Sequence, residues 1–285
     1  MPHSDPKTLV STAWLADHLT APDLRLFDAS WFLPTVDRDA KAEYTAKHIA
    51  GARFFDIDEI ADLRSELPHM LPPVEKFMSR VRAMGVGDGH QIVVYDSMGI
   101  FSAPRVWWTF RYFGKRDIAV LDGGLPKWER EGRPVTDAPP VIRDRHMTVD
   151  KQFDMVKDVT EVAAAAKLGD WVIVDARAAD RFRGEAPEPR PGLRMGHIPR
   201  SRNVPWMSLL RDDGTMRPPA ELKRIFEAAG VDLAKPIISS CGSGVNAAIL
   251  DLALTRIGHK RHAVYDGAWA EWGMYNDLAV ATGEA

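Results

Sequence analysis

The feature that most constrains the fold of this chain is an internal repeat. Asp28 ends one apolar segment and Asp175 ends another, 147 residues further along. Three more segments recur in the same order at spacings of 144–149 residues. The four matched pairs are residues 24–28 with 172–175, 48–52 with 197–201, 92–100 with 237–245, and 121–128 with 265–272. This constant order and spacing predict two copies of one domain.

Each copy alternates short apolar strands with helical patterns. In the first copy, residues 24–28, 91–95 and 118–121 are typical of buried strands, and a helix is expected after each of them. The alternation predicts an α/β fold with two tandem domains, each a parallel sheet with helices on both faces. The predicted boundaries are 1–137 for the N-terminal domain, 138–157 for a linker containing Pro139-Pro140, and 158–285 for the C-terminal domain.

The only cysteine among the 285 residues, Cys241, lies where a strand is predicted to pass into a helix that begins at Val245. Gly242 and Gly244 allow this loop to turn with several backbone N–H groups facing inward. Those groups and the helix N-terminus favour an anion at the sulfur, so we expect a lowered thiol pKa and a Cys that holds a thiolate or a persulfide. A lone cysteine is otherwise a small buried hydrophobe; the flanking glycines favour chemistry.

In the first copy, Asp96 stands at the position of Cys241. A carboxylate there is expected to cap the following helix and not to act as the nucleophile. The first copy is therefore predicted to be a non-catalytic domain that serves as a scaffold and as one wall of the cleft.

Composition excludes several classes of function. The chain is 45% hydrophobic and 27% charged with a formal net charge of −3, which gives no footprint for nucleic acid or an anionic membrane surface. One cysteine excludes an intramolecular disulfide, and a Cys-based zinc site would need more thiolates. No apolar run approaches membrane-spanning length, and the N-terminus lacks a signal-peptide core. We therefore expect a cytoplasmic protein without nucleic-acid or membrane partners.

Residues 241–247 read Cys-Gly-Ser-Gly-Val-Asn-Ala. With the repeat, this loop resembles the rhodanese superfamily, specifically its two-domain sulfurtransferases of the 3-mercaptopyruvate type, over essentially the whole chain. The family usually has Thr where this chain has Asn246, and its thiosulfate-preferring members carry basic residues after the Cys, where this loop is neutral. The resemblance implies tandem rhodanese-like domains and a persulfide on Cys241. It also implies Ser243 as a catalytic residue and Gly242, Gly244, Val245 and Asn246 as substrate-binding residues.

A second motif, residues 180–199, supports the same branch. The family uses the arginines matching Arg181 and Arg190 to bind the carboxylate and keto oxygens of the donor. The chemistry agrees, because a guanidinium binds planar oxygen pairs through two parallel charge-assisted hydrogen bonds. An isolated surface arginine is more often a solvated charge, but both of these lie in a recognisable loop.

From the first copy, His48 and Asp37 resemble residues implicated with Ser243 in a proton relay near the sulfur. A His, or an Asp–His–Ser chain, can move the proton released when sulfur leaves carbon. The competing interpretation is that His48 and its repeat counterpart His197 fill the same structural position in both domains.

The sequence thus predicts a sulfurtransferase that moves sulfane sulfur from 3-mercaptopyruvate to a thiol or cyanide acceptor through a Cys241 persulfide, releasing pyruvate. The expected acceptor is a thiol such as a reduced thioredoxin-like protein, and neither a metal nor an organic cofactor is implied. Thiosulfate as the donor and a non-catalytic sulfur-carrier role stay open as alternatives. A cysteine phosphatase or arsenate reductase is disfavoured, because its loop needs an Arg six residues after the Cys, where this chain has Ala247.

Overall fold

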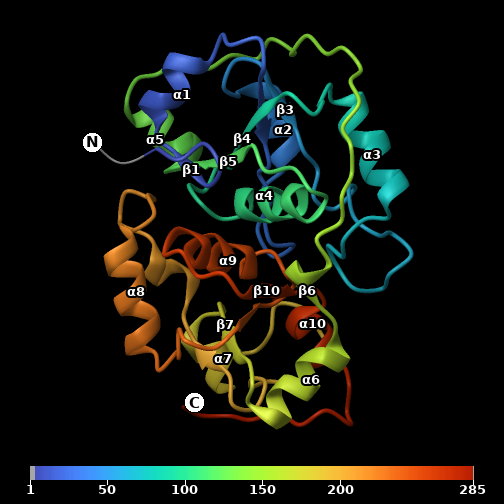
Figure 1. Ribbon diagram of the computed structural model, residues 1–285, viewed down its shortest axis with the longest axis vertical. Coiled ribbons are helices and arrows are strands. Elements are labelled where there is room, and N and C mark those ends of the chain that lie inside the picture. The colour runs from blue at the N-terminus through green and yellow to red at the C-terminus, as the bar shows by residue number, and fades with distance from the viewer. Residues whose placement is uncertain (1–3, 285) are drawn as a thin grey trace. The chain divides into compact units, whose positions relative to one another are not determined.

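The computed structural model describes residues 4–284, which form two compact units. Unit 1 consists of residues 4–63, 71–152 and 211–216, and unit 2 of residues 64–70, 153–210 and 217–284 (Figure 1). Each unit therefore includes a short segment from the other half of the sequence. Residues 138–152 belong to unit 1, where Thr148 donates from its backbone N and its Oγ1 to the carboxylate of Asp88, at 2.6 and 2.8 Å. The predicted boundaries 1–137 and 158–285 stay a prediction.

Unit 1 is built on a parallel five-stranded sheet in the order β1-β5-β4-β2-β3. The central strand Gln91–Tyr95 is mostly apolar and rich in β-branched residues, as expected for a strand buried on both faces. The strands are β1 (Leu9–Val10), β2 (Leu24–Asp28), β3 (Ala52–Phe54), β4 (Gln91–Tyr95) and β5 (Ile118–Leu121). The helices are α1 (Thr12–His18), α2 (Ala40–Ala46), α3 (Val74–Ala83), α4 (Ala103–Tyr112) and α5 (Gly124–Arg130).

Helices cover both faces of this sheet. Leu15 of α1 and Trp128 of α5 pack with Leu26 and Val93 of the sheet in one core cluster. On the other side, Phe110 of α4 lies against Phe27 of β2, with ring centroids 5.8 Å apart, and α3 packs on α4 through aromatic rings. Unit 1 is thus a three-layer α/β structure.

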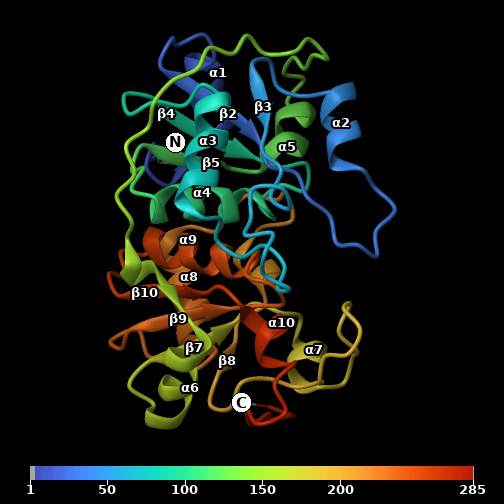
Figure 2. The same ribbon diagram turned by 90° about the vertical axis from the view of Figure 1, so that its right-hand side faces the viewer.

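Unit 2 repeats this architecture, with the strand order β6-β10-β9-β7-β8. Figure 2 shows α8 and α9 on one side of the sheet and α6 on the other. The strands are β6 (Val156–Lys157), β7 (Val172–Asp175), β8 (Arg202–Asn203), β9 (Ile237–Ser240) and β10 (His262–Tyr265). The helices are α6 (Val159–Leu168), α7 (Ala179–Arg183), α8 (Pro219–Ala228), α9 (Ala247–Arg256) and α10 (Ala268–Trp272), with 3-10 turns η1 (Phe153–Met155) and η2 (Trp206–Leu209). The two orders match strand for strand, which confirms the predicted repeat and the α/β fold.

No helix within residues 4–284 is long and apolar enough to span a membrane.

Candidate active site around Cys241

Cys241 lies immediately after β9, in the loop that leads into α9. The start of α10 holds this loop from the other side, because the backbone N–H groups of Trp269 and Ala270 donate to the carbonyls of Cys241 and Gly242, both at 2.9 Å. The cysteine is 2% exposed. The loop is therefore a fixed backbone turn with its thiol inside the protein.

The sulfur faces three backbone donors, the N–H groups of Ser243, Gly244 and Ala247. Burial raises the pKa of the Cys241 thiol, and these three hydrogen bonds act in the opposite direction. The predicted ring of inward-facing N–H groups is present, but the predicted lowering of the pKa is wrong in its net direction. The reason is that removing the thiolate from water outweighs three backbone hydrogen bonds.

The twin loop in unit 1 shows what this backbone turn binds. One carboxylate oxygen of Asp96 accepts from Met98 N at 2.9 Å, and the other accepts from the N–H groups of Phe101, Ser102 and Ala103 at 2.8, 3.0 and 2.9 Å. Met98 and Ser102 are the repeat counterparts of Ser243 and Ala247. In unit 1 the protein thus fills an anion-binding turn with its own side chain, while in unit 2 the same turn surrounds a sulfur.

Arg181, on the short helix α7, lies beside the Cys241 loop. A Cβ atom on Gly242 would come within 3.1 Å of Arg181 Nη2, so the absent side chain leaves room for the guanidinium. Glu188 holds this arginine by accepting from its Nη2 with Oε2. Arg181, a residue singled out from the sequence, therefore places a cation beside the Cys241 loop.

A buried ion-pair chain continues behind Arg181. Glu188 Oε1 accepts from Arg177 Nη1 at 2.6 Å, and Arg177 Nη2 donates to Asp175 Oδ2 at 2.7 Å. The Arg177 guanidinium also lies 4.3 Å from the ring centroid of Trp269. Each charged group in this series of ion pairs has a partner of opposite charge, as burial requires. Neither Arg177 nor Glu188 was singled out from the sequence, because their roles arise from the fold around the end of β7.

Arg190 lies in the loop after α7, and its Nη2 is 3.3 Å from Nε2 of His69. His69 belongs to the segment that unit 2 takes from the first half of the sequence; it is 6% exposed and has φ 62°, in the left-handed region. This histidine was not predicted from the sequence, because residues 64–70 lie outside the matched repeat segments and outside any predicted strand or helix. An imidazole next to a predicted donor-binding arginine is a candidate for proton transfer.

His48 has a different environment, in unit 1. It is 1% exposed, its Nδ1 lies 2.8 Å from Tyr44 O and its Nε2 lies 3.1 Å from Ala138 O. His197 is placed in the same way in unit 2, with Nδ1 2.8 Å from Phe182 O. Each ring also stacks on the aromatic residue whose carbonyl it contacts, and each backbone forms an isolated bridge. These contacts favour the structural interpretation of His48.

The remaining predicted residues fall in two places. Asp37 is exposed in the segment before α2 of unit 1. Ser243 and Val245 are buried in the Cys241 loop, and Asn246 is the N-cap residue of α9 without a side-chain capping bond. Nδ2 of Asn246 is buried and has no hydrogen-bond partner among residues 4–284. An unpartnered buried amide of this kind is a candidate donor to a ligand.

The family model of the rhodanese-like domain matches this chain twice, at residues 11–131 and 158–275. The chain is 43% identical to the 3-mercaptopyruvate sulfurtransferase of Escherichia coli (strain K12), over 95% of this chain and 96% of the relative. It is 41% identical to the thiosulfate sulfurtransferase of Bos taurus, over 93% and 92%. The crystal structure of SseA from Escherichia coli, presented as a rhodanese-fold 3-mercaptopyruvate enzyme, matches with a TM-score of 0.84 and 40% identity, over 92% of this chain and 98% of that one.

Proposed function

This chain belongs to the rhodanese-like family, as a two-domain enzyme of the sulfurtransferase type, and we propose that it transfers sulfur from 3-mercaptopyruvate to a thiol or cyanide acceptor. The observation that carries the proposal is the neutral, anion-binding loop at Cys241 with Arg181 directly beside it. Overall identity does not choose the donor, since relatives named for mercaptopyruvate and for thiosulfate are nearly equally similar. We choose 3-mercaptopyruvate over thiosulfate as the donor because the Cys241 loop itself is neutral and the nearby cation is Arg181.

In the proposed reaction, the Cys241 thiolate attacks the sulfur atom of 3-mercaptopyruvate. A sulfur–sulfur bond forms and the carbon–sulfur bond breaks, with its electron pair moving to carbon to give the enolate of pyruvate. The enolate takes up a proton and leaves as pyruvate. A second thiolate or cyanide then attacks the outer sulfur, and the Cys241 thiolate returns. The backbone N–H groups of Ser243, Gly244 and Ala247 stabilise sulfur when it is anionic.

The donor is held by the arginines. Arg181 and Arg190 are proposed to bind the carboxylate and keto oxygens of the donor, positioning its sulfur for attack. Thiosulfate carries two negative charges and would gain from cations on the loop itself, where this chain has Gly242 and Ser243. His69, next to Arg190, is the proposed proton donor to the enolate in place of His48, whose ring contacts two backbone carbonyls.

A thiol acceptor fits a reducing compartment, so we propose a reduced thioredoxin-like protein or a small thiol, encountered in the cytoplasm. A non-catalytic sulfur carrier is the second candidate, and the buried thiol with a raised pKa is the observation that favours it. Steady-state release of pyruvate from 3-mercaptopyruvate separates the two, because a carrier loaded by a partner protein would release none.

Cys241→Ser tests the nucleophile. Intact mass after donor treatment should show that the wild-type chain gains one sulfur atom and the variant none. The chain has no other thiol, so sulfur uptake by the variant would refute the assignment.

Arg190→Ala and Arg181→Ala test the choice of donor. Each should lower kcat/KM for 3-mercaptopyruvate by about 10- to 150-fold, the effect of losing a hydrogen bond to a charged group, and should lower it less for thiosulfate. An equal loss with both donors would mean that the arginines hold the loop and do not recognise the keto acid.

A further inference from the structure

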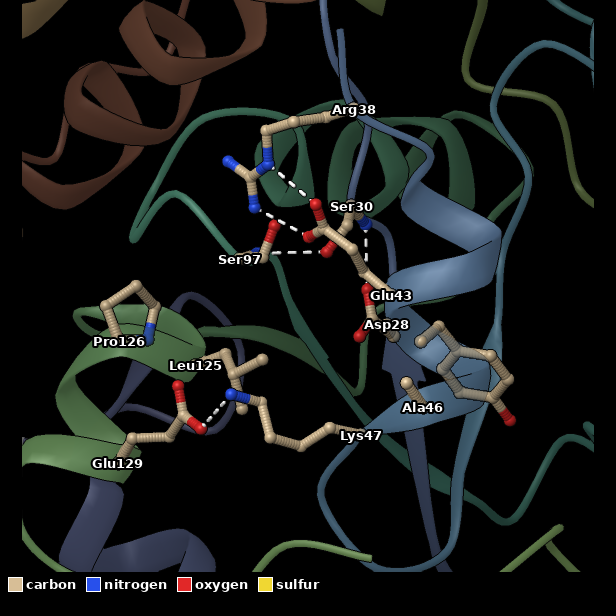
Figure 3. Close-up of a pocket in the computed structure, with 11 residues that line it drawn as sticks. Asp28, Ser30, Arg38, Glu43, Ala46, Lys47, Ser97, Leu125, Pro126 and Glu129 are labelled. Carbon is tan, nitrogen blue, oxygen red and sulfur yellow. Dashed lines mark hydrogen bonds and ion pairs between the residues drawn. The ribbon is translucent and has the colours of Figure 1, made fainter. Parts of the chain in front are cut away.

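Unit 1 contains a cavity of about 270 Å³ at the end of β2, beside the Asp96 loop (Figure 3). The ion pairs Arg38–Glu43 and Lys47–Glu129, with N–O distances of 2.6 Å each, frame it. The volume is several times the roughly 30 Å³ that one water molecule occupies in the liquid. The cavity therefore has room for a small organic molecule.

The repeat explains why the cavity exists. Asp28 corresponds to Asp175 of unit 2, and Ser30 corresponds to Arg177. The backbone turn is the same in both units: Ser30 N donates to Asp28 Oδ1 at 2.9 Å, and Arg177 N donates to Asp175 Oδ1 at 2.9 Å. Only the side chain differs, a long guanidinium in unit 2 and a short hydroxyl in unit 1.

Apart from Glu188, the positions that surround that guanidinium recur around the cavity. In unit 2, Arg177 contacts the carboxylate of Asp175, the carbonyl of Gly196 at 2.8 Å and the ring of Trp269. The repeat counterparts of these three residues all line the cavity of unit 1; they are Asp28, Lys47 and Leu125. The cavity therefore lies at the repeat position that an arginine side chain occupies in the other unit.

Because unit 1 has Ser30 at the position of Arg177, its buried carboxylate Asp28 has no counterion among the described residues. Asp28 is 1% exposed and forms no ion pair within residues 4–284. Burial raises its pKa to about 6, so the carboxyl is largely ionised at neutral pH. In the same cavity, Ser97 Oγ is buried and has no hydrogen-bond partner in the described part of the chain. Among the residues that the structure describes, Asp28 accepts hydrogen bonds from Ser30 and Tyr95 but has no cation beside it, whereas Ser97 Oγ has no partner at all. A buried charge is normally paired and a buried hydroxyl is normally hydrogen-bonded, so these two groups favour a ligand with a positive charge and N–H donors.

We propose that this cavity binds a small organic cation with a guanidinium head group, which pairs with Asp28 as Arg177 pairs with Asp175. A planar guanidinium donates two parallel hydrogen bonds to one carboxylate and has further N–H groups for Ser97. The site lies within unit 1 and does not depend on the proposed sulfur transfer.

Methylguanidinium is the probe, followed by ligand-observed NMR titration at pH 8 on the full-length protein. The wild type should bind it with one site per chain, and N-methylurea, its neutral analogue, should bind at least about tenfold more weakly, the effect of losing a charge-assisted hydrogen bond. Equal binding of the two compounds, or no binding of methylguanidinium, overturns the proposal.

Two variants locate the site. Asp28→Asn removes the charge, and Ser30→Arg supplies the missing guanidinium from the protein, so each should weaken methylguanidinium binding by at least about tenfold. Asp17→Asn, an exposed carboxylate on α1, is the matched control and should bind as the wild type does. Wild-type affinity in Ser30→Arg overturns the proposal even if Asp28→Asn does not fold.

The affinity should also fall as the pH drops through about 6, because only the ionised Asp28 pairs with the cation. Affinity that is unchanged between pH 8 and pH 5 overturns the role of Asp28. The other titratable groups that line the cavity or interact with Asp28 are Arg38, Glu43, Tyr44, Lys47, Tyr95, Asp96 and Glu129.

Discussion

Glu188 links the buried ion pair of Arg177 to Arg181, the arginine beside the Cys241 loop. It is 2% exposed at its side chain and accepts from two arginines, of which only Arg181 approaches Gly242. Arg177 keeps a second carboxylate, Asp175, whereas Glu188 is the only ion-pair partner of Arg181 in the described part of the chain. Glu188 is therefore a positioning residue for the proposed donor-binding cation.

We expect Glu188→Gln to raise KM for 3-mercaptopyruvate by about tenfold or more, because one charge-assisted bond that holds Arg181 is lost. KM for thiosulfate should change less, and the kcat ratio of the two donors should stay near its wild-type value. Glu185→Gln is the control, since Glu185 pairs with Arg183 in an exposed position. A variant with unchanged KM for both donors would show that Glu188 only stabilises the fold.

Asp28 predicts how the stability of unit 1 depends on pH. Its pKa is raised from 3.8 to about 6 in the folded protein, so the folded state keeps a proton that the unfolded state has already released. Protonated Asp28 therefore makes its full contribution to the free energy of unfolding below about pH 4. That contribution is lost as the pH rises through 6, and the free energy of unfolding falls by up to about 3 kcal/mol. Asp28→Asn should therefore be more stable than the wild type at pH 8, and urea unfolding should show this difference shrinking toward pH 4.

The local geometry at Cys241 was predictable because it depends on residues that are neighbours in sequence. Cys241 and its ring of N–H groups follow from a strand, two glycines and a helix start. His69 was not predicted, because its contact with Arg190 joins residues that are 121 positions apart. The pKa of the thiol was also misjudged, since the sequence shows the donors in the loop but not how completely the fold removes water.

At the level of elements, helix caps stabilise each unit locally. Asp158 accepts from Glu161 N at 2.9 Å, and Glu161 accepts from Asp158 N at 3.1 Å, which forms a capping box at the start of α6. Asp158→Ala should lower the free energy of unfolding of unit 2 by about 1 kcal/mol. Ser11→Ala, at the N-cap of α1, should have a similar effect on unit 1 alone. Residue-resolved hydrogen exchange at increasing urea concentrations measures the free energy of unfolding of each unit separately and checks both variants.

The long buried strands were predictable, and the short edge strands were not. Residues 24–28, 91–95, 118–121 and 172–175 form strands with the predicted bounds. By contrast, β1, β3, β6 and β8 are two or three residues long, too short for a periodic pattern, and were not predicted. Their pairing is set by the neighbouring strands in the sheet. Helix α9 begins at Ala247 and not at the predicted Val245, because the two intervening residues belong to the loop around the sulfur.

For the whole molecule, the repeat implies that the two units use one backbone turn for different purposes. Asp96→Asn would turn an amide N–H toward backbone donors that now bind a carboxylate, so unit 1 should lose about 1–3 kcal/mol of stability. Sulfur loading should stay at one atom per chain, because Cys241 is in unit 2. Urea unfolding and intact mass on the same sample check both outcomes. A variant that no longer loads sulfur would contradict this separation.

Each unit contains a short segment from the other half of the sequence, residues 211–216 in unit 1 and 64–70 in unit 2, and this affects folding during translation. Residues 211–216 belong to unit 1, where Met216 N donates to Asp122 Oδ1 at 2.8 Å and Arg130 Nη2 donates to Asp213 O at 2.5 Å. When the first 152 residues have emerged from the ribosome, unit 1 therefore still lacks residues 211–216. If the two halves of the chain were produced separately, the N-terminal half would lack residues 211–216 of unit 1. The C-terminal half would lack residues 64–70 of unit 2.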